Sequence, residues 1–253
     1  MNKKKVILSI SAHDPTGGAG LQSDILTSSL YNHHCVSALT GQTVQTTKKL
    51  LKKSSSKPDI FLTNLKNLSK DFKIDGIKVG ALWSPEINRA LIKFLKKIDV
   101  PIVIDTIVSA GGGGNFILKK NLSDFVKNLY PLANLITPNN HELKAISGCK
   151  SLDKAIKKLL ELNINKVYIT GNIHDGEVIN YLYINGEKKL ETKSNFLNKE
   201  VHGTGCALST SILCNLVNGS SLEKACIESH KLLYGLVQNS TKTSDQNIID
   251  FSI

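Results

Sequence analysis

Arginine, paired cysteines and long apolar runs are nearly or wholly missing from this sequence. Arg89 is the only arginine, so the net charge of +11 rests on lysines that are spread along the chain. Because arginine is the preferred residue for planar recognition of phosphates and bases, we expect a solvated basic surface and no nucleic-acid partner. The five cysteines are scattered and odd in number, without a CxxC pair, which argues against a disulfide framework or a zinc site.

The lack of long apolar runs bears on location. The sequence has no apolar run of roughly 18 residues, which argues against a membrane span or a membrane partner. Residues 6–10 are too short for the apolar part of a signal peptide, so we expect a cytoplasmic protein. The 253 residues, 41% of them hydrophobic, contain no linker, repeat or shift in composition, and they predict one domain over residues 1–253.

Short apolar segments alternate with amphipathic segments of helical period. We expect strands near residues 6–10, 35–44, 74–82, 100–108, 134–137 and 166–170, a hairpin over 178–190, and helices near 20–31, 58–68, 84–97, 122–130, 151–162, 206–218 and 222–238. This alternation predicts an α/β fold with a mostly parallel sheet and helices on both faces. Ligands bind such sheets at the carboxyl ends of the strands. The residues expected there are Asp14, Gln42, Asp105, Asn139 and Glu142.

A glycine-rich turn opens the helix expected from residue 206. In Gly203-Thr204-Gly205-Cys206, two glycines flank a threonine and a cysteine follows. The first turn of a helix leaves backbone N–H groups unpaired and carries partial positive charge, so it can bind an anion or stabilise a transferring phosphoryl group. The same field is expected to lower the pKa of the Cys206 thiol. The alternative is an ordinary tight turn with a buried structural cysteine.

A second glycine-rich segment, from Asp14 to Gly20, follows the first strand. It lacks the lysine of a P-loop and does not fit GxGxxG, but its glycines let the backbone approach a small ligand closely. Asp24, in the helix that follows, could accept a hydrogen bond from a hydroxyl group. The alternative is a plain turn between strand and helix, capped by its aspartate or threonine.

Polar residues at three more strand ends could meet phosphates or a metal. Asn139 and Glu142 flank a helix start, where an acid suits Mg²⁺ held through water; the alternative is a helix cap made by the same two residues. Asp105 lies in an apolar strand and needs a partner or a site, because an unpaired buried acid is costly. Thr170 and Gly171 end another strand, and they could contact a phosphate or form a simple turn.

Two of these segments together are similar to a known family. The run from Asp14 to Asp24 and the run from His202 to Cys206 resemble the motifs of hydroxymethylpyrimidine/phosphomethylpyrimidine kinases of thiamine biosynthesis, in the ribokinase-like superfamily. The resemblance covers nearly the whole chain. It implies a three-layer α/β/α domain, commonly a homodimer, that uses ATP and Mg²⁺. The implied substrates are 4-amino-5-hydroxymethyl-2-methylpyrimidine and then its monophosphate.

The resemblance also assigns roles by position. It implies that Gln42 reads the edge of the pyrimidine with its amide and that Asp24 helps to position the substrate. Cys206 stands where ribokinases place an aspartate base. The remaining implied assignments are an anion hole at Gly203, Thr204 and Gly205, substrate contacts at Ala12, Gly20 and Ala81, nucleotide contacts at Asp105, Asn139, Thr170 and Gly171, and Mg²⁺, directly or through water, at Glu142 and Asp105.

The sequence departs from the family pattern at four places. Ala12-His13 stands where the family usually has Gly-Ser, Ala81 where Met is frequent, and Thr170 where many members have Lys. The loop 110–113 reads Ala-Gly-Gly-Gly in place of Ala-Lys-Ser-Gly, which removes a cation that could neutralise phosphate charge. The glycines 111–114 predict either a mobile flap or a flexible loop.

Two other functions stay open at this point. Pyridoxal or pyridoxine kinases are close relatives that share the cysteine after the glycine-rich turn and often a threonine at the position of Thr170. A non-catalytic pyrimidine-binding protein would also account for the missing lysines.

Overall fold

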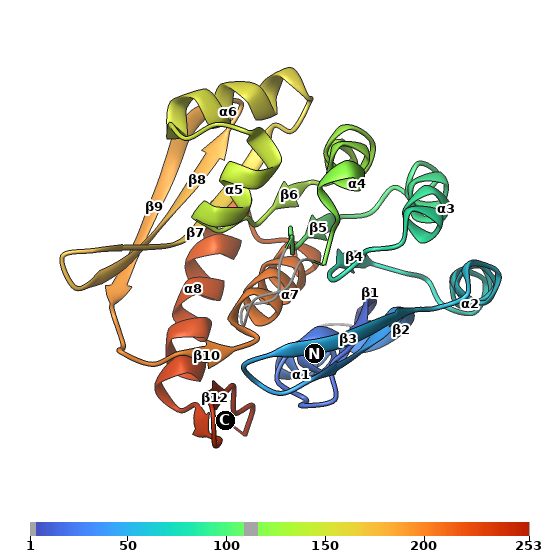
Figure 1. Ribbon diagram of the computed structural model, residues 1–253, viewed down its shortest axis with the longest axis horizontal. Coiled ribbons are helices and arrows are strands. Elements are labelled where there is room, and N and C mark those ends of the chain that lie inside the picture. The colour runs from blue at the N-terminus through green and yellow to red at the C-terminus, as the bar shows by residue number, and fades with distance from the viewer. Residues whose placement is uncertain (1–3, 109–115, 253) are drawn as a thin grey trace.

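A nine-stranded sheet runs through the centre of the protein (Figure 1), in the order β3-β2-β1-β4-β5-β6-β7-β8-β9. The computed structural model describes residues 4–108 and 116–252. Parallel pairs join the six inner strands, and antiparallel pairs add β3 at one edge and β8 and β9 at the other. The strands are β1 Val6–His13, β2 His34–Gln45, β3 Leu50–Ser55, β4 Gly76–Val79, β5 Ile102–Ile104, β6 Leu135–Ile136, β7 Lys166–His174, β8 Glu177–Ile184 and β9 Glu187–Asn195.

Helices cover both faces of this sheet. They are α1 Gly20–Leu30, α2 Pro58–Asp71, α3 Pro85–Leu95, α4 Lys119–Asp124, α5 Asn140–Ser147, α6 Leu152–Glu161, α7 Thr204–Val217 and α8 Leu222–Gln238. Side chains of α2, α3, α5 and α6 share one apolar core, and those of α7 and α8 share the other. Successive strand residues alternate between the two cores: Ile7 joins the second and Leu8 the first. The expected three-layer α/β/α fold is confirmed.

Some elements differ from their expected form. Strand β3 was not foreseen, because its six residues are half-buried or exposed and show no apolar alternation. The helix expected near 122–130 is a short α-helix that continues as a π turn over Phe125–Leu129 and a 3-10 turn over Tyr130–Leu132. The hairpin turn at Asn185-Gly186 is confirmed, and both residues have positive φ, at 51° and 84°.

A small second sheet lies beside the end of the chain. It contains β10 Val201–His202, β12 Asn247–Ile248 and β11 Thr241–Lys242, in that order. β10 leads directly into α7, so this sheet fixes the start of that helix. No helix among the described residues has the length and apolar character needed to cross a membrane.

Candidate active site

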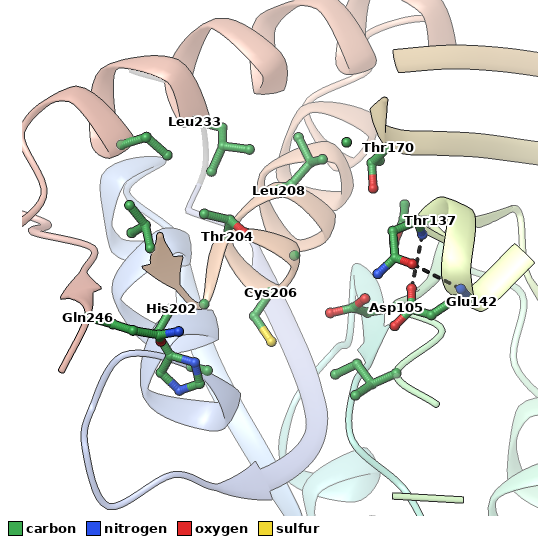
Figure 2. Close-up of a pocket in the computed structure, with 18 of the residues that line it drawn as sticks. Asp105, Thr137, Glu142, Thr170, His202, Thr204, Cys206, Leu208, Leu233 and Gln246 are labelled. Atoms are coloured by element: carbon green, nitrogen blue, oxygen red, sulfur yellow. Dashed lines mark hydrogen bonds between the residues drawn. The ribbon is translucent and has the colours of Figure 1, made fainter. Parts of the chain in front are cut away.

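A cavity of about 780 Å³ opens at the carboxyl ends of the parallel strands. The six inner strands β1, β2, β4, β5, β6 and β7 all end beside it, and α7 begins at it. The strand-end residues that line it are Ala12 and His13 after β1, Ala81 after β4, Asp105 after β5, Thr137 after β6 and Thr170 in β7. Figure 2 shows Cys206 and Asp105 on opposite sides of this space, with Glu142 beside Asp105.

The start of α7 is a left-handed glycine without a side-chain cap. Gly203 has φ +90°, and a Cβ at this position would lie 1.7 Å from the carbonyl oxygen of Gly18. No side chain among the described residues caps it. The first helical bond runs from the Ala207 N–H to the Gly203 carbonyl. The amides of Thr204, Gly205 and Cys206 therefore lack partners within the helix, and these residues line the cavity.

The Cys206 thiol differs from the expectation. Burial raises its pKa to about 12, although the Lys78 ammonium acts in the opposite direction. The prediction of a lowered pKa is wrong, because the side chain is only 5% exposed and the loss of hydration outweighs the field of the helix. Cys206 is thus a protonated thiol at neutral pH, and its side chain lowers the pKa of the neighbouring Asp105 carboxyl.

The two glycine-rich turns are joined by a hydrogen bond. The His202 Nε2 atom lies 2.8 Å from the Asp14 Oδ2 atom. Burial disfavours the Asp14 charge, but hydrogen bonds from His202, Gln45 and the Thr16 N–H hold the pKa of Asp14 well below its usual range. Asp14 therefore fixes both turns at once. The sequence placed Asp14 at a strand end but gave no sign of this pair, whose members are 188 residues apart.

Asp24 does not reach the cavity. It is fully buried and pairs with the fully buried Lys78, at 2.8 Å between Oδ1 and Nζ. Ser9 and Thr210 donate hydrogen bonds to the same carboxylate, at 2.5 and 2.9 Å. The role in positioning substrate is therefore corrected to a structural one. Burial opposes the Lys78 charge, but Asp24, Cys206 and Asp105 together raise the pKa of Lys78.

Gln42 is also outside the cavity. Its side chain is exposed, whereas Thr43 and Gln45 line the cavity. Strand side chains alternate between the faces of a sheet, so a residue next to a lining residue points away from it. The structure thus corrects the substrate contact assigned to Gln42 and places Gln45 at the cavity.

The other residues assigned to the substrate lie at the cavity. Ala12, Ala81 and Phe116 form a small apolar wall. Trp83 belongs to the same apolar cluster, and its ring is stacked on that of Phe116 at 5.5 Å between centroids. Gly20 also lines the cavity. Its φ is +62°, and a Cβ at this position would lie only 2.3 Å from the carbonyl oxygen of Ala12, so only glycine fits here. The wall can accept a small flat ring.

Asp105 and Glu142 form a buried acidic pair at the other side. Asp105 is 5% exposed and its Oδ2 atom has no hydrogen-bond partner among the described residues. Burial raises the pKa of Asp105, and burial together with the Asp105 charge raises that of Glu142 to about 8. Two acids in this state would be stabilised by a cation.

Glu142 also completes a helix cap. Asn139 Oδ1 accepts from the Glu142 N–H at 2.9 Å, and Glu142 Oε2 accepts from the Asn139 N–H at 3.0 Å. The capping alternative is therefore correct for the start of α5. It does not exclude a ligand, because both residues line the cavity.

The comparison with family models decides which proteins this chain resembles. Residues 14–249 match the model described as phosphomethylpyrimidine kinase. The chain belongs to this family. The match begins at Asp14 and includes both glycine-rich turns, so it contains every part of the cavity described above except the end of β1.

Curated relatives agree with this membership. The hydroxymethylpyrimidine/phosphomethylpyrimidine kinase of Aquifex aeolicus is 29% identical over 97% of this chain and 100% of its own length. The bifunctional thiamine biosynthesis protein ThiDN of Methanocaldococcus jannaschii is 30% identical over 94% of this chain. The chain spans about half the length of that relative and of two other bifunctional relatives, at 54%, 49% and 45%.

Solved structures share the fold. The pyridoxal kinase of Staphylococcus aureus in complex with pyridoxal has a TM-score of 0.88 at 23% identity, over 99% of this chain and 94% of that one. The phosphomethylpyrimidine kinase of Clostridium difficile has a TM-score of 0.78 at 27% identity, over 92% of this chain and 99% of that one. The ribokinase-like architecture is therefore shown.

The far end of the cavity contains residues that the sequence did not indicate. Leu233, Tyr234 and Val237 of α8 line it, as do Thr170 and Gly171. Their helical spacing is that of any packed helix, so no sequence signal marked them. The loop 110–113, where the family pattern has a lysine, and the possible flap at 111–114 lie outside the described residues.

Proposed function

We propose that this protein transfers the γ-phosphoryl group of ATP to 4-amino-5-hydroxymethyl-2-methylpyrimidine, and then phosphorylates the monophosphate. The observation that carries this proposal is the uncapped start of α7, whose free amides face a cavity with an apolar wall on one side and an acidic pair on the other. Family membership supports it. We also propose that the protein is a cytoplasmic homodimer. Size-exclusion chromatography with light scattering would test its oligomeric state.

The site suits phosphoryl transfer because this reaction needs mainly positioning and charge stabilisation. The amides of Thr204, Gly205 and Cys206 are the donors for the negative charge that develops on the transferring group. Cys206 lies at this turn and faces Asp105. The Asp105 carboxylate can take the proton of the substrate hydroxyl as the new P–O bond forms and the bond between the γ-phosphoryl group and the departing ADP breaks.

The acidic pair fits the magnesium ion that accompanies ATP. The Asp105 Oδ2 atom, which has no hydrogen-bond partner among the described residues, and the Glu142 carboxyl, whose pKa is raised, suit a divalent cation. Among the described residues, no group of three or more His, Cys, Asp and Glu side chains could hold a metal ion alone. Water and phosphate oxygens would complete the shell, which is the habit of Mg²⁺. The bound ion would supply neutralisation of phosphate charge.

The test is ADP release by the full chain with MgATP and the hydroxymethylpyrimidine, with pyridoxal in a parallel reaction. The proposal expects rapid release with the pyrimidine and production of both mono- and diphosphate by mass spectrometry. Faster release with pyridoxal would favour the pyridoxal kinase alternative, which the fold also permits. Tight binding of the pyrimidine without ADP would favour a non-catalytic binding protein.

Two glutamines on one strand sharpen the substrate assignment. If the cavity as described binds the pyrimidine, Gln45→Leu raises KM for the pyrimidine by about tenfold, because the cavity loses a polar amide that also hydrogen-bonds to Asp14. Gln42→Leu, at an exposed position of the same strand, leaves KM unchanged. A raised KM in Gln42→Leu, with an unchanged KM in Gln45→Leu, would instead show that Gln42 contacts the substrate.

A further inference from the structure

The pairing of β7 with β8 is interrupted at the cavity, where two residues of β7 lie opposite one residue of β8. Ile169 pairs with Tyr181 and Asn172 pairs with Ile179, so two residues of β7, Thr170 and Gly171, oppose Asn180 alone. Gly171 has φ +72°, in the left-handed region. This is a β-bulge with a left-handed glycine, a device that re-aims a strand beside a site.

The Asn180 side chain replaces the lost ladder bond. It is 3% exposed, and its Oδ1 atom accepts from the Gly171 N–H at 2.9 Å. A backbone N–H can only donate, so the oxygen of this amide must be the atom that faces Gly171. The Nδ2 atom is then directed to the other side, where it lies 2.9 Å from the His230 Nδ1 atom and 3.3 Å from the Tyr168 hydroxyl oxygen.

The direction of these bonds also fixes His230. Because the Asn180 Nδ2 atom can only donate, His230 Nδ1 must accept, and the neutral ring carries its proton on Nε2. Burial of this α8 side chain lowers its pKa, in keeping with a neutral ring. His230 lines the cavity with Leu233 and Tyr234 of the same helix. The Asn180 amide therefore ties α8 to the bulge of β7.

The bulge is held on its other side by the start of α5. The Thr170 N–H donates to the Pro138 carbonyl at 3.0 Å, and Thr170 forms a bridge with Asn139. Figure 2 shows Thr170 beside Thr137, across the cavity from Thr204. Asn180 thus joins the bulge to α8, and Thr170 joins the same bulge to the capped start of α5.

We propose that Asn180 is a positioning residue for the nucleotide, because its amide holds the Thr170-Gly171 bulge and the His230 ring as walls of one pocket. The proposal rests on the ATP-dependent function above. The substrate wall at Ala12 and Ala81 belongs to other strands, β1 and the segment after β4. Loss of the Asn180 amide should therefore affect nucleotide binding and leave pyrimidine binding unchanged.

The experiment measures the dissociation constants of ADP and of the hydroxymethylpyrimidine by calorimetry, each on the full chain. Asn180→Ala removes both the acceptor of the Gly171 N–H and the donor to His230, so the bulge and the His230 ring lose their common anchor. The ADP constant should therefore rise by about tenfold while the pyrimidine constant stays the same. Tyr168→Phe is the matched control: it removes one neighbour of Asn180 but not the bond to Gly171, and the ADP constant should not change.

Thermal unfolding by circular dichroism accompanies each variant. Should the alanine variant fail to fold, Asn180→Ser, which offers a shorter acceptor, is measured in its place, with a smaller increase expected for ADP alone. An unchanged ADP constant, or a parallel loss of both ligands, in a folded variant would overturn the role of Asn180. Failure of the unaltered protein to bind ADP would overturn the proposed function as well.

Discussion

Two of the helices that begin at the cavity, α7 and α5, have first turns that are built in opposite ways. α7 starts at Gly203, a left-handed residue with no side-chain cap among the described residues. α5 starts at Asn139, and a reciprocal pair of hydrogen bonds with Glu142 satisfies two of its amides. Both turns carry the partial positive charge of a helix start. Of these two helices, α7 has no side chain over its first amides among the described residues, whereas α5 presents a carboxylate.

This difference suits the two helix starts to different parts of a phosphoryl-transfer site. Open amides suit the transferring phosphoryl group, and a carboxylate over a capped turn suits the cation that accompanies the phosphates. The comparison therefore assigns the anion to α7 and the cation to α5. Four substitutions test this assignment.

Replacement of Gly203 by alanine has the largest expected effect. The added Cβ would meet the Gly18 carbonyl oxygen at 1.7 Å, so the two glycine-rich turns must move apart. If the α7 amides hold the phosphoryl group, kcat falls by about 10²-fold or more. Steady-state kinetics on a folded sample checks this.

Gly219→Ala is the matched control for that substitution. Gly219 has φ +87°, but no described atom lies within 4 Å of the added Cβ. This variant should lose about 1–2 kcal/mol of stability from backbone strain alone and keep its kcat. An equal kcat in Gly203→Ala and Gly219→Ala would contradict the proposal that the α7 amides hold the phosphoryl group.

Cys206→Ala comes next. If the thiol acts at the phosphoryl group, kcat falls by about 10²-fold while KM changes little, because ground-state binding is kept. Cys214→Ala, in the same helix but fully buried outside the cavity, should lower the melting temperature and leave kcat unchanged. Full activity of Cys206→Ala would make that residue structural.

The sequence predicted the backbone of this site better than its side chains. The alternation of apolar strands and helices gave the parallel sheet, and the glycine-rich turns gave the start of α7, because these features depend on local periodicity and on φ. The capping pair at the start of α5 was also visible as one of two alternatives, since its spacing is local.

The errors arose where distant parts of the chain decide the outcome. Asp24 was assigned to the substrate, but Lys78, which is far away in sequence, is its buried partner. The pKa of Cys206 was expected to fall with the helix field, yet burial by the folded chain raises it. The assignment of Gln42 depended on which face of β2 meets the cavity. A shift of one position along a strand moves a side chain to the opposite face.

Glu142→Gln tests the cation side of the comparison. Glutamine can keep the cap, so the variant mainly removes the charge. The folded-state pKa of Glu142 is raised to about 8, so its ionisation costs stability. This cost is absent near pH 4, where the acid is protonated in both states, and grows as the pH rises toward 8. Without Mg²⁺, the variant should therefore become progressively more stable than the unaltered protein over this range.

Melting temperatures between pH 5 and 8 in a magnesium-free buffer measure this difference. Glu161→Gln, at an exposed α6 position, is the control and should show no such trend. Addition of Mg²⁺ with ADP should reverse the advantage of Glu142→Gln, since the carboxylate then has a cation. A constant difference across the range would contradict the buried acidic pair.

Asn139→Ala has the smallest expected effect. The substitution removes the acceptor for the Glu142 N–H, and loss of such a cap lowers the free energy of unfolding by about 1 kcal/mol. Asn139→Asp keeps a capping oxygen and should recover most of this stability. A denaturant titration measures both. Because the cap already occupies two amides at the start of α5, kcat should fall far less than in Gly203→Ala. A loss of kcat as large as in Gly203→Ala would show that α5, too, holds the phosphoryl group directly.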